Sequence, residues 1–372
     1  MTCLIPDKYH DLLLTIGAYA HKLGLNAWVV GGAVRDFYLG RPTVDIDLTF
    51  NGTQESVAGF CVKTWGGVKR KFSRFGTYKV TLDNGFRLDL ARLRKETYPY
   101  PGALPEVSFT TKVKEDLFRR DFTCNAWALS ILPDTFGQSV DPYGARNDID
   151  KKLLRVLHEK SFFDDPTRMY RGLRFAGRFG WKAAPKTKQL FLEADREQAP
   201  LLLTRERFCQ EFMKVLAEEH IKAVFDYLIQ YDLLKFAWPS LTWTPALEQV
   251  HTAAERLGVL VCSLKENGEE FLASFTTSHE LAQAIREVWK IEQERLSPLT
   301  PLTDFQRTIL TAVMPQLPPQ ALEPCVLRGK DLKDLGVYGR SISTLLNQVR
   351  RAQWEGKIAT REAGLKFIGL AA

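Results

Sequence analysis

The sequence lacks the features of a disulfide-bonded, zinc-binding or membrane-spanning protein. Its 372 residues include six cysteines that stand singly, without any Cys-x-x-Cys pair, so neither a structural zinc site nor a disulfide framework is expected. It contains no run of about 18 apolar residues, which a transmembrane helix needs. Residues 1–7 have neither the basic start nor the long apolar stretch of a signal peptide. We therefore expect a cytoplasmic protein without a membrane partner.

Acidic residues are in the minority. Lys and Arg number 51 against 44 Asp and Glu, which gives a net charge of +7. A basic surplus fits a polyanionic partner such as RNA, and nothing in the sequence implies a protein partner. The hydrophobic content of 45% is ordinary for a globular protein, and the length indicates two or more domains.

Strand patterns are confined to the first part of the chain. An apolar helical period precedes Gly24, and short strands are expected at 27–30 and 44–50. Runs at 77–82 and 86–90 flank Asp83-Asn84-Gly85, which predicts a hairpin. Residues 95–113 contain three prolines and are expected to form an irregular loop. From about residue 150 onward the pattern is helical, so the sequence predicts an α+β protein: a small α/β domain and then a helical array.

A glycine turn precedes two carboxylates that are one residue apart. Gly31 and Gly32 follow the first strand, and Asp45 and Asp47 alternate with apolar residues on the second. Side chains two apart on a strand share a face, so the two carboxylates repel each other unless a cation lies between them. Mg²⁺ is commonly held by one or two carboxylates together with substrate phosphates. The alternative is a polar strand face beside an ordinary turn. Asp89, on the second hairpin strand, could face the same site.

Four arginines recur at helical spacing after Asp165-Pro166, which is a good helix start. At about 100° per residue they fall within roughly a 120° arc. These arginines are Arg168, Arg171, Arg174 and Arg178. Like charges this close favour an anionic ligand, phosphate or base, over the alternative of a solvated face. Arg120, in Arg119-Arg120-Asp121, could reach a triphosphate, although ordinary surface ion pairs are equally compatible with that segment.

Five segments together resemble the class II tRNA nucleotidyltransferase family, which comprises CCA-adding enzymes and their CC-adding, A-adding and bacterial poly(A) polymerase relatives. The resemblance covers about residues 25–215, in the order of the family's motifs. The segments are Gly31-Gly32-Ala33-Val34-Arg35-Asp36 with Asp45-x-Asp47, Arg119-Arg120-Asp121-Phe122-Thr123-x-Asn125-Ala126, Asp141-Pro142-x-Gly144, Asp164-Asp165-x-x-Arg168 and Glu206-Arg207. One departure is Asp164, where the family often has Glu.

The resemblance implies a polymerase-β-like nucleotidyltransferase head followed by an all-helical neck, body and tail. We place the head at 1–145, the neck at 146–215, and the body and tail at 216–372. By resemblance, Asp45 and Asp47 are the catalytic residues and hold Mg²⁺. The residues implied in nucleotide binding are Gly32, Arg35, Arg120, Asp165, Arg168, Arg171 and Arg174. Asp165 and Arg168 would pair with the edge of the base.

The implied activity is the addition of C and A residues of the 3′-terminal CCA to tRNA from CTP and ATP, without a nucleic-acid template. The motifs do not separate this activity from CC addition, A addition or poly(A) synthesis. A non-catalytic RNA-binding relative and a small-molecule adenylyltransferase are further alternatives. The intact Asp-x-Asp pair disfavours the first of these, and the arginine helix with its long basic extension disfavours the second.

Overall fold

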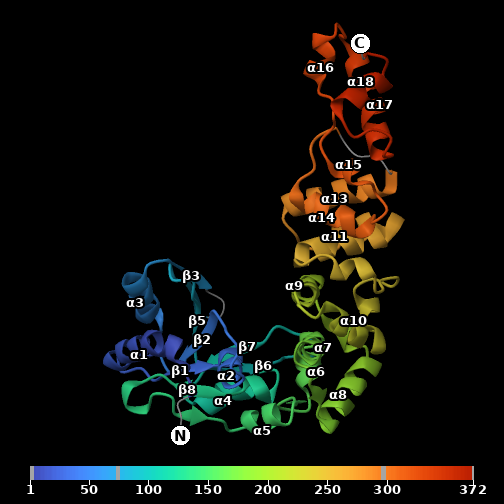
Figure 1. Cartoon of the computed structure of the whole chain (residues 1–372). Coiled ribbons are helices and arrows are strands. Elements are labelled where there is room, and N and C mark those ends of the chain that lie inside the picture. The colour runs from blue at the N-terminus through green and yellow to red at the C-terminus, as the bar shows by residue number, and fades with distance from the viewer. Residues whose placement is uncertain (1–3, 73–75, 295–298, 371–372) are drawn as a thin grey trace. The chain divides into compact units, whose positions relative to one another are not determined.

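The computed structural model describes residues 4–72, 76–294 and 299–370. The chain divides into two compact units, Met1–Leu203 and Thr204–Ala372, and each is described by itself. The first unit contains every strand of the described chain (Figure 1). The division into head, neck, body and tail at residues 145 and 215 stays a prediction.

A seven-stranded sheet with the order β3-β4-β5-β2-β1-β8-β9 forms the centre of the first unit. Its strands are β1 Ala27–Val30, β2 Asp45–Phe50, β3 Val68–Phe72, β4 Thr77–Thr81, β5 Arg87–Arg92, β8 Ala128–Ser130 and β9 Ser139–Val140. The pair β2–β5 is parallel and the other neighbours are antiparallel. The predicted strands at 27–30 and 44–50 and the predicted hairpin are confirmed.

The alternation of side chains along β2 and β5 divides the sheet into an apolar face and a polar face. Ile46, Leu48, Leu88 and Leu90 are buried, and the residues between them point to the opposite face. At β1 and β8 this second face is covered, because Leu117 packs there against Val30, Ala126 and Ala128. The polar face of β2 and β5 therefore carries Asp45, Asp47 and Asp89.

Helices surround this sheet and continue into the rest of the first unit. They are α1 Asp7–Lys22, α2 Gly32–Tyr38, α3 Glu55–Trp65, α4 Val113–Phe118, α5 Ala145–Asp150, α6 Ser161–Asp164, α7 Thr167–Phe179 and α8 Pro185–Arg196. Asp141 caps α5, because its two carboxylate oxygens accept from the backbone N–H groups of Ala145 and Arg146 at 2.7 and 3.0 Å. The Asp-Pro-x-Gly turn therefore has a structural role.

The prediction of an irregular loop over residues 95–113 is wrong. The strands β6 Arg94–Thr97 and β7 Glu106–Phe109 form a separate antiparallel pair there. The three prolines lie at 99, 101 and 105, in the connection between the strands, and so remove no N–H group from the ladder. The tip of this hairpin is held by the Gly102 N–H, which donates to the Phe163 carbonyl at 2.8 Å.

The expectation that residues after 145 are entirely helical also needs one correction. β10 Leu153–Leu154 and β11 Lys182–Ala183 form a short parallel pair. It brackets α7, the arginine-bearing helix, because one strand precedes that helix and the other follows it. Two residues per strand are too few to give a strand signal in the sequence.

The second unit is helical. Its helices are α9 Arg205–Leu216, α10 Ile221–Gln230, α11 Ala253–Ser263, α12 Gly268–Ala273, α13 His279–Glu294, α14 Asp304–Val313, α15 Pro319–Leu322, α16 Gly329–Asp334, α17 Arg340–Trp354 and α18 Arg361–Phe367. Buried Arg256 of α11 donates to the carbonyls of Leu216 and Glu218, both at 2.6 Å, and so satisfies the end of α9. A separate apolar cluster around Leu332 and Val349 joins α16 to α17.

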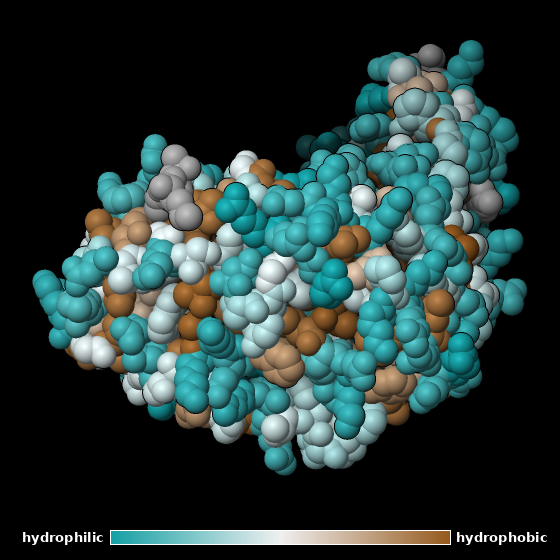
Figure 2. Space-filling model, turned by 90° about the horizontal axis from the view of Figure 1, so that it is seen from below, coloured by the Kyte–Doolittle hydropathy of each residue, from teal (hydrophilic) through white to brown (hydrophobic). Residues whose placement is uncertain are grey.

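In the described part of the chain, no helix is long and apolar enough to cross a membrane. One face of the molecule is mostly hydrophilic, with hydrophobic residues in small scattered groups (Figure 2). The five described cysteines are free thiols, and Cys3 lies outside the described residues.

Alanine substitutions at two helical glycines are expected to have opposite effects on stability. A Cβ at Gly17 of α1 would overlap the Ile131 carbonyl oxygen, whereas at Gly59 of α3 it would meet only the flexible end of Lys69, at 3.4 Å. We expect Gly17→Ala to lower the free energy of unfolding by about 1–3 kcal/mol, because rigid backbone must move. Gly59→Ala should raise it by about 0.5–1 kcal/mol through helix propensity. Urea unfolding of both variants tests these two expectations. Equal changes in the free energy of unfolding would contradict the close approach of Gly17 to the Ile131 carbonyl.

Candidate active site

The glycine turn between β1 and α2 brings backbone against charged side chains. Gly31 has φ +77° and ψ −136°, a conformation that favours glycine. Its N–H donates to the Trp127 carbonyl at 3.1 Å. A Cβ at this position would lie 2.5 Å from Nη1 of Arg120 and 3.3 Å from Oδ2 of Asp47. Gly31 is therefore required both by its φ angle and by the side chains that crowd it.

Three carboxylates share the polar face of the sheet. Asp45 and Asp47 of β2 are exposed on either side of buried Ile46. Asp47 lies opposite Asp89 in the parallel pairing of β2 with β5. The expectation that Asp89 faces the same side as the other two carboxylates is confirmed.

Basic side chains partly neutralise these carboxylates. Arg87 forms a two-point ion pair with Asp45, with Nε–Oδ1 at 2.6 Å and Nη2–Oδ2 at 2.8 Å. Lys79 lies 3.5 Å from Asp89. Both pairs are exposed, so they hold the carboxylates only weakly and can be exchanged for a ligand.

Asp47 has a raised pKa. Solvent reaches it from the polar face, but protein atoms crowd its other sides, and this desolvation raises its pKa. Arg120 opposes the rise, while the neighbouring Asp89 and Asp45 add to it. A cation placed between the carboxylates would relieve both the repulsion and the desolvation.

The oxygen atoms of these carboxylates suit a hard divalent cation whose coordination is completed by a bound ligand. Among the described residues, no group of three or more His, Cys, Asp or Glu is arranged to hold a metal by itself. Mg²⁺ does not need such a group, since it is typically bound by one or two carboxylates and by substrate phosphates. Asp45 and Asp47 provide oxygen ligands of this kind on one face, so they fit that cation.

The end of α4 positions two arginines through one buried acid. Asp116 is fully buried and binds Arg119 through Nε and Nη2, at 3.0 and 2.9 Å, and Arg120 through Nη2 at 3.4 Å. Burial alone would raise the pKa of Asp116, but the two guanidinium groups bring it below its usual value. Within the described residues, Nε of Arg120 is buried without a hydrogen-bond acceptor. A buried unmatched donor beside Asp47 is suited to an anionic group.

The arginine face of α7 is packed against protein. Arg168 is 3% exposed and Arg174 is 7% exposed, which rules out a solvated face at these two positions. The helix begins at Thr167, and the Asp165 carboxylate accepts from the N–H and the hydroxyl of Thr167 at 3.1 and 2.6 Å. Asp165 therefore lies one residue before the N-cap, Pro166, and bonds the first residue of the helix, while its contact with a nucleotide stays a prediction.

A buried polar network joins α7 to the glycine-turn helix. Arg171 donates to Oδ2 of Asp121 from Nε and Nη2, at 2.9 and 2.5 Å. Asp121 accepts from Asn125 Nδ2 at 2.9 Å, and Asn125 accepts from Arg35 Nη1 at 2.6 Å. Arg35 is 4% exposed and also pairs with Asp36, at 3.0 Å for Nε–Oδ1. The structure thus gives Arg35 a bracing role, and its contact with a nucleotide stays a prediction.

An aromatic ring of α7 lies beneath several of these cations. The Phe175 ring centroid is 5.5 Å from the Arg35 guanidinium carbon and 5.3 Å from that of Arg174. Cations over a ring face are stabilised by its quadrupole. The ring therefore helps to keep like charges together where a polyanion could bind.

The sequence-predicted residues fall into two groups within the first unit. Gly32, Asp45, Asp47 and Arg120 lie around the glycine turn, and Asp165, Arg168, Arg171 and Arg174 lie on or beside α7. Asp116 and Phe175 were not predicted, and Asn125 was named only as part of a motif, without a role of its own. Asp116 precedes the two arginines by three and four residues, a helical ion-pair spacing that could have identified it.

The ionised Asp121 carboxylate is expected to make the stability of the protein fall at low pH. Burial would raise its pKa, but Arg171, Asn125 and the Phe122 N–H bring the pKa far below its usual value. The ionised group therefore contributes its full stability above about pH 4, and this stability is lost as the pH falls toward the folded-state pKa. Asp121→Asn should lower the free energy of unfolding by about 3 kcal/mol at pH 7, because it leaves Arg171 opposite a neutral group.

The difference between the wild type and Asp121→Asn should narrow as the pH is lowered from about 5 to about 2, as urea unfolding at each pH would show. The exposed Asp134, changed to Asn, is the matched control and should behave as the wild type throughout. A gap that stays constant with pH would contradict the ionised buried pair.

Comparisons with known proteins identify relatives of the chain. The family model of the poly A polymerase head domain matches residues 27–155. A CCA-adding enzyme of Streptococcus pyogenes serotype M2 is 30% identical over 357 residues, which cover 94% of this chain and 80% of the relative. An A-adding tRNA nucleotidyltransferase of Halalkalibacterium halodurans is 38% identical over 192 residues, or 52% of this chain and 45% of the relative. The chain spans less than half the length of the A-adding relatives that it matches.

Solved structures share the fold. The apo form II of a CCA-adding enzyme superposes with a TM-score of 0.72 at 24% identity, covering 98% of this chain and 96% of that one. The Thermotoga maritima CCA-adding enzyme, solved in complex with tRNA, superposes with a TM-score of 0.69 at 23% identity and with the same coverage. From its match to the head-domain model and its near full-length similarity to CCA-adding enzymes, the chain belongs to the class II tRNA nucleotidyltransferase family.

Proposed function

We propose that this protein is a tRNA nucleotidyltransferase that adds C residues, A residues or both to the 3′ end of tRNA, building the terminal CCA from CTP and ATP without a nucleic-acid template. Pyrophosphate is the second product. The observation that carries the proposal is the placement of Asp45 and Asp47 on one sheet face, beside a glycine turn occupied by the Arg120 guanidinium.

The reaction is an attack of the tRNA 3′-hydroxyl on the α-phosphate of the nucleotide. Mg²⁺ bound to Asp45 and Asp47 would lower the pKa of the hydroxyl and neutralise charge on the leaving pyrophosphate. Arg120 lies next to Asp47, and its buried, unmatched Nε donor suits a phosphate oxygen of the triphosphate. Gly31, without a Cβ, leaves room for that guanidinium.

Base selection is assigned to the start of α7. Asp165 supplies acceptors and Arg168 supplies donors, and the two side chains lie 3.9 Å apart at Oδ2 and Nε. A donor–acceptor pair of this kind can match the edge of a base and reject another base through unpaired polar groups. Arg171 and Arg174, from the same face, are assigned to the base or the phosphates.

The nucleic-acid partner is proposed from charge and from relatives. The chain carries a net charge of +7, and a relative of the same fold was solved in complex with tRNA, while others were solved with CTP and with ATP. We assign the head to 1–145, base selection to 146–215 and tRNA binding to 216–372. The free thiols suit a reducing compartment, and we propose the cytoplasm.

The number and kind of nucleotides added is a separate question. A-adding relatives are 35–38% identical over 52–66% of this chain, whereas the CCA-adding relatives from Streptococcus are 29–30% identical over 94–98% of it. Similarity therefore favours neither product, and poly(A) synthesis uses the same motifs. A non-catalytic RNA-binding role is disfavoured by the complete carboxylate face.

Removing either predicted metal ligand tests the chemistry. We expect Asp45→Ala and Asp47→Ala each to abolish incorporation of radiolabelled nucleotide into tRNA, because the cation loses an oxygen ligand. Binding of tRNA in a gel-shift assay should stay within about twofold of the wild type, since neutralising a carboxylate removes no contact to phosphate. Chelation of divalent cations should reproduce the loss in the wild type.

The exposed carboxylate of Asp11, on α1, provides the matched control for these variants. Asp11→Ala should incorporate nucleotide at the wild-type rate. Full activity of Asp47→Ala, or loss of tRNA binding in a folded Asp45→Ala protein, would refute the assignment of these carboxylates.

A further inference from the structure

Arg168 is held by four hydrogen-bond acceptors of the first unit. Nη1 donates to the Ser161 hydroxyl at 2.7 Å and faces His158 Nε2 at 3.3 Å. Nη2 donates to the Arg119 carbonyl at 2.9 Å and to the Tyr98 hydroxyl at 3.5 Å. We call these four groups the Arg168 cradle. They surround a guanidinium that is itself buried.

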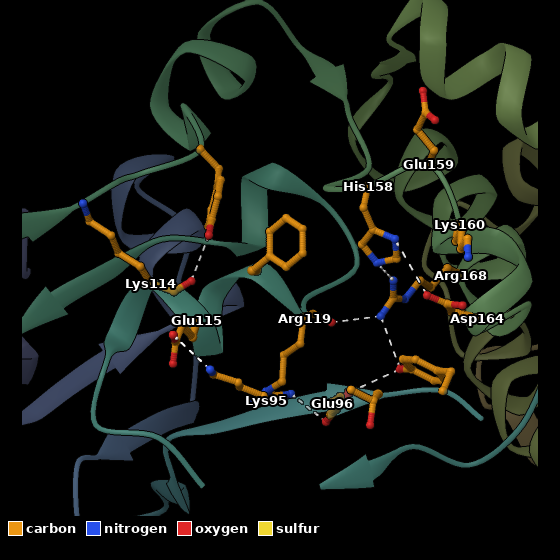
Figure 3. Close-up of a pocket in the computed structure, with 14 residues that line it drawn as sticks. Lys95, Glu96, Lys114, Glu115, Arg119, His158, Glu159, Lys160, Asp164 and Arg168 are labelled. Atoms are coloured by element: carbon orange, nitrogen blue, oxygen red, sulfur yellow. Dashed lines mark hydrogen bonds and ion pairs between the residues drawn. The ribbon is translucent and has the colours of Figure 1, made fainter. Parts of the chain in front are cut away.

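His158 acts in the cradle as an uncharged acceptor. Arginine has donors only, so Nε2 must accept and the ring proton must lie on Nδ1. Nδ1 faces Oδ2 of Asp164 at 3.8 Å, which suits this tautomer (Figure 3). Burial and the Arg168 charge lower the pKa of His158 to about 4, so the ring is neutral at physiological pH. His158 therefore lies between the Asp164 carboxylate and the Arg168 guanidinium.

The cradle has two short contacts and two long ones. The Ser161 and Arg119 contacts have the lengths of strong hydrogen bonds, whereas the His158 and Tyr98 contacts are at or beyond the usual range. The short contacts fix the position of the guanidinium. The long contacts restrict its tilt and are the ones that a competing acceptor can displace most easily.

The long contacts face open space. Tyr98, His158 and Arg168 line a cavity of about 810 Å³, together with Arg119 and Asp164 (Figure 3). Of the residues assigned to the nucleotide, Arg168 is the one that reaches this cavity. The cavity gives the His158 and Tyr98 side chains room to move when Arg168 changes partners.

We propose that His158 and Tyr98 are positioning residues for nucleotide selection, which act on the base through the guanidinium of Arg168. This inference rests on the proposed function. A guanidinium that is free to tilt offers its donors to more than one base edge, whereas one restrained on both Nη atoms offers a single pattern. Discrimination between bases then depends on side chains that do not touch the nucleotide.

Tyr98 and Tyr143 provide a matched pair for the test. Both line the cavity, but the Tyr143 hydroxyl donates to the Lys114 carbonyl at 2.9 Å, away from Arg168. We expect Tyr98→Phe and His158→Ala to lower discrimination of CTP over UTP, measured as the ratio of kcat/KM on a tRNA transcript, by about tenfold, the effect of one hydrogen bond to a charged group. The change should lie in KM, with kcat for CTP within about twofold of the wild type.

Two further variants separate positioning from general packing. His158→Gln keeps a side-chain acceptor and should recover most of the lost discrimination, while Tyr143→Phe should match the wild type. In an Arg168→Lys background, neither Tyr98→Phe nor His158→Ala should cause a further loss, because both act through the guanidinium. Additive losses in that background, or equal effects of the two tyrosine variants, would overturn the proposal.

Equilibrium titration with CTP and UTP keeps this test independent of turnover. If the wild type extends no tRNA, the proposed function fails, but the ratio of the two dissociation constants still reports on the cradle. An unchanged ratio in Tyr98→Phe and His158→Ala would overturn the inference. A wild type that binds none of CTP, UTP and ATP would overturn both.

Discussion

The ion pair between Asp121 and Arg171 is the interaction on which the candidate site depends. Its carboxylate is buried, and the pair joins the arginine helix α7 to the segment that carries Asn125, which in turn bonds Arg35 of α2. An unpaired charge at this depth costs several kcal/mol, so the two elements are held together as long as both groups are ionised. The residues proposed to select the base and to bind the phosphates thereby keep a fixed relation inside one compact unit.

Acidic and basic side chains gather on different elements around this ion pair. Carboxylates collect on the polar face of β2 and β5, and guanidinium groups collect at the end of α4 and on α7. Each set repels itself. The arginines are restrained by buried partners, Asp116 for Arg119 and Arg120 and Phe175 for those of α7, whereas the carboxylates have only the exposed ion pairs with Arg87 and Lys79 among the described contacts. A nucleoside triphosphate with its cation supplies the missing charges of both signs, which is why this arrangement suits nucleotidyl transfer.

Local pattern predicted the sheet and the carboxylate face, because alternation of side chains and an Asp-Asn-Gly turn are visible within a few residues. The β6–β7 strands were missed because the three prolines that suggested a loop lie between the strands. The cradle could not be predicted, since Tyr98 precedes Arg168 by 70 residues and the Arg119 acceptor is a backbone carbonyl with no sequence signature. Likewise, the bond from Arg35 to Asn125 could not be predicted, because Asn125 lies 90 residues further along the chain.

The most direct test offers the purified protein, with Mg²⁺, tRNA transcripts that end at the discriminator base, at C or at CC, and supplies CTP, ATP or both. Product lengths are then determined on a sequencing gel. The proposed function predicts extension of at least one transcript by C or A: three additions with both nucleotides define a CCA-adding enzyme, and a stop after CC or a single A on the CC end defines a specialist. A long A ladder would indicate poly(A) synthesis instead, and no extension of any transcript would contradict the catalytic assignment.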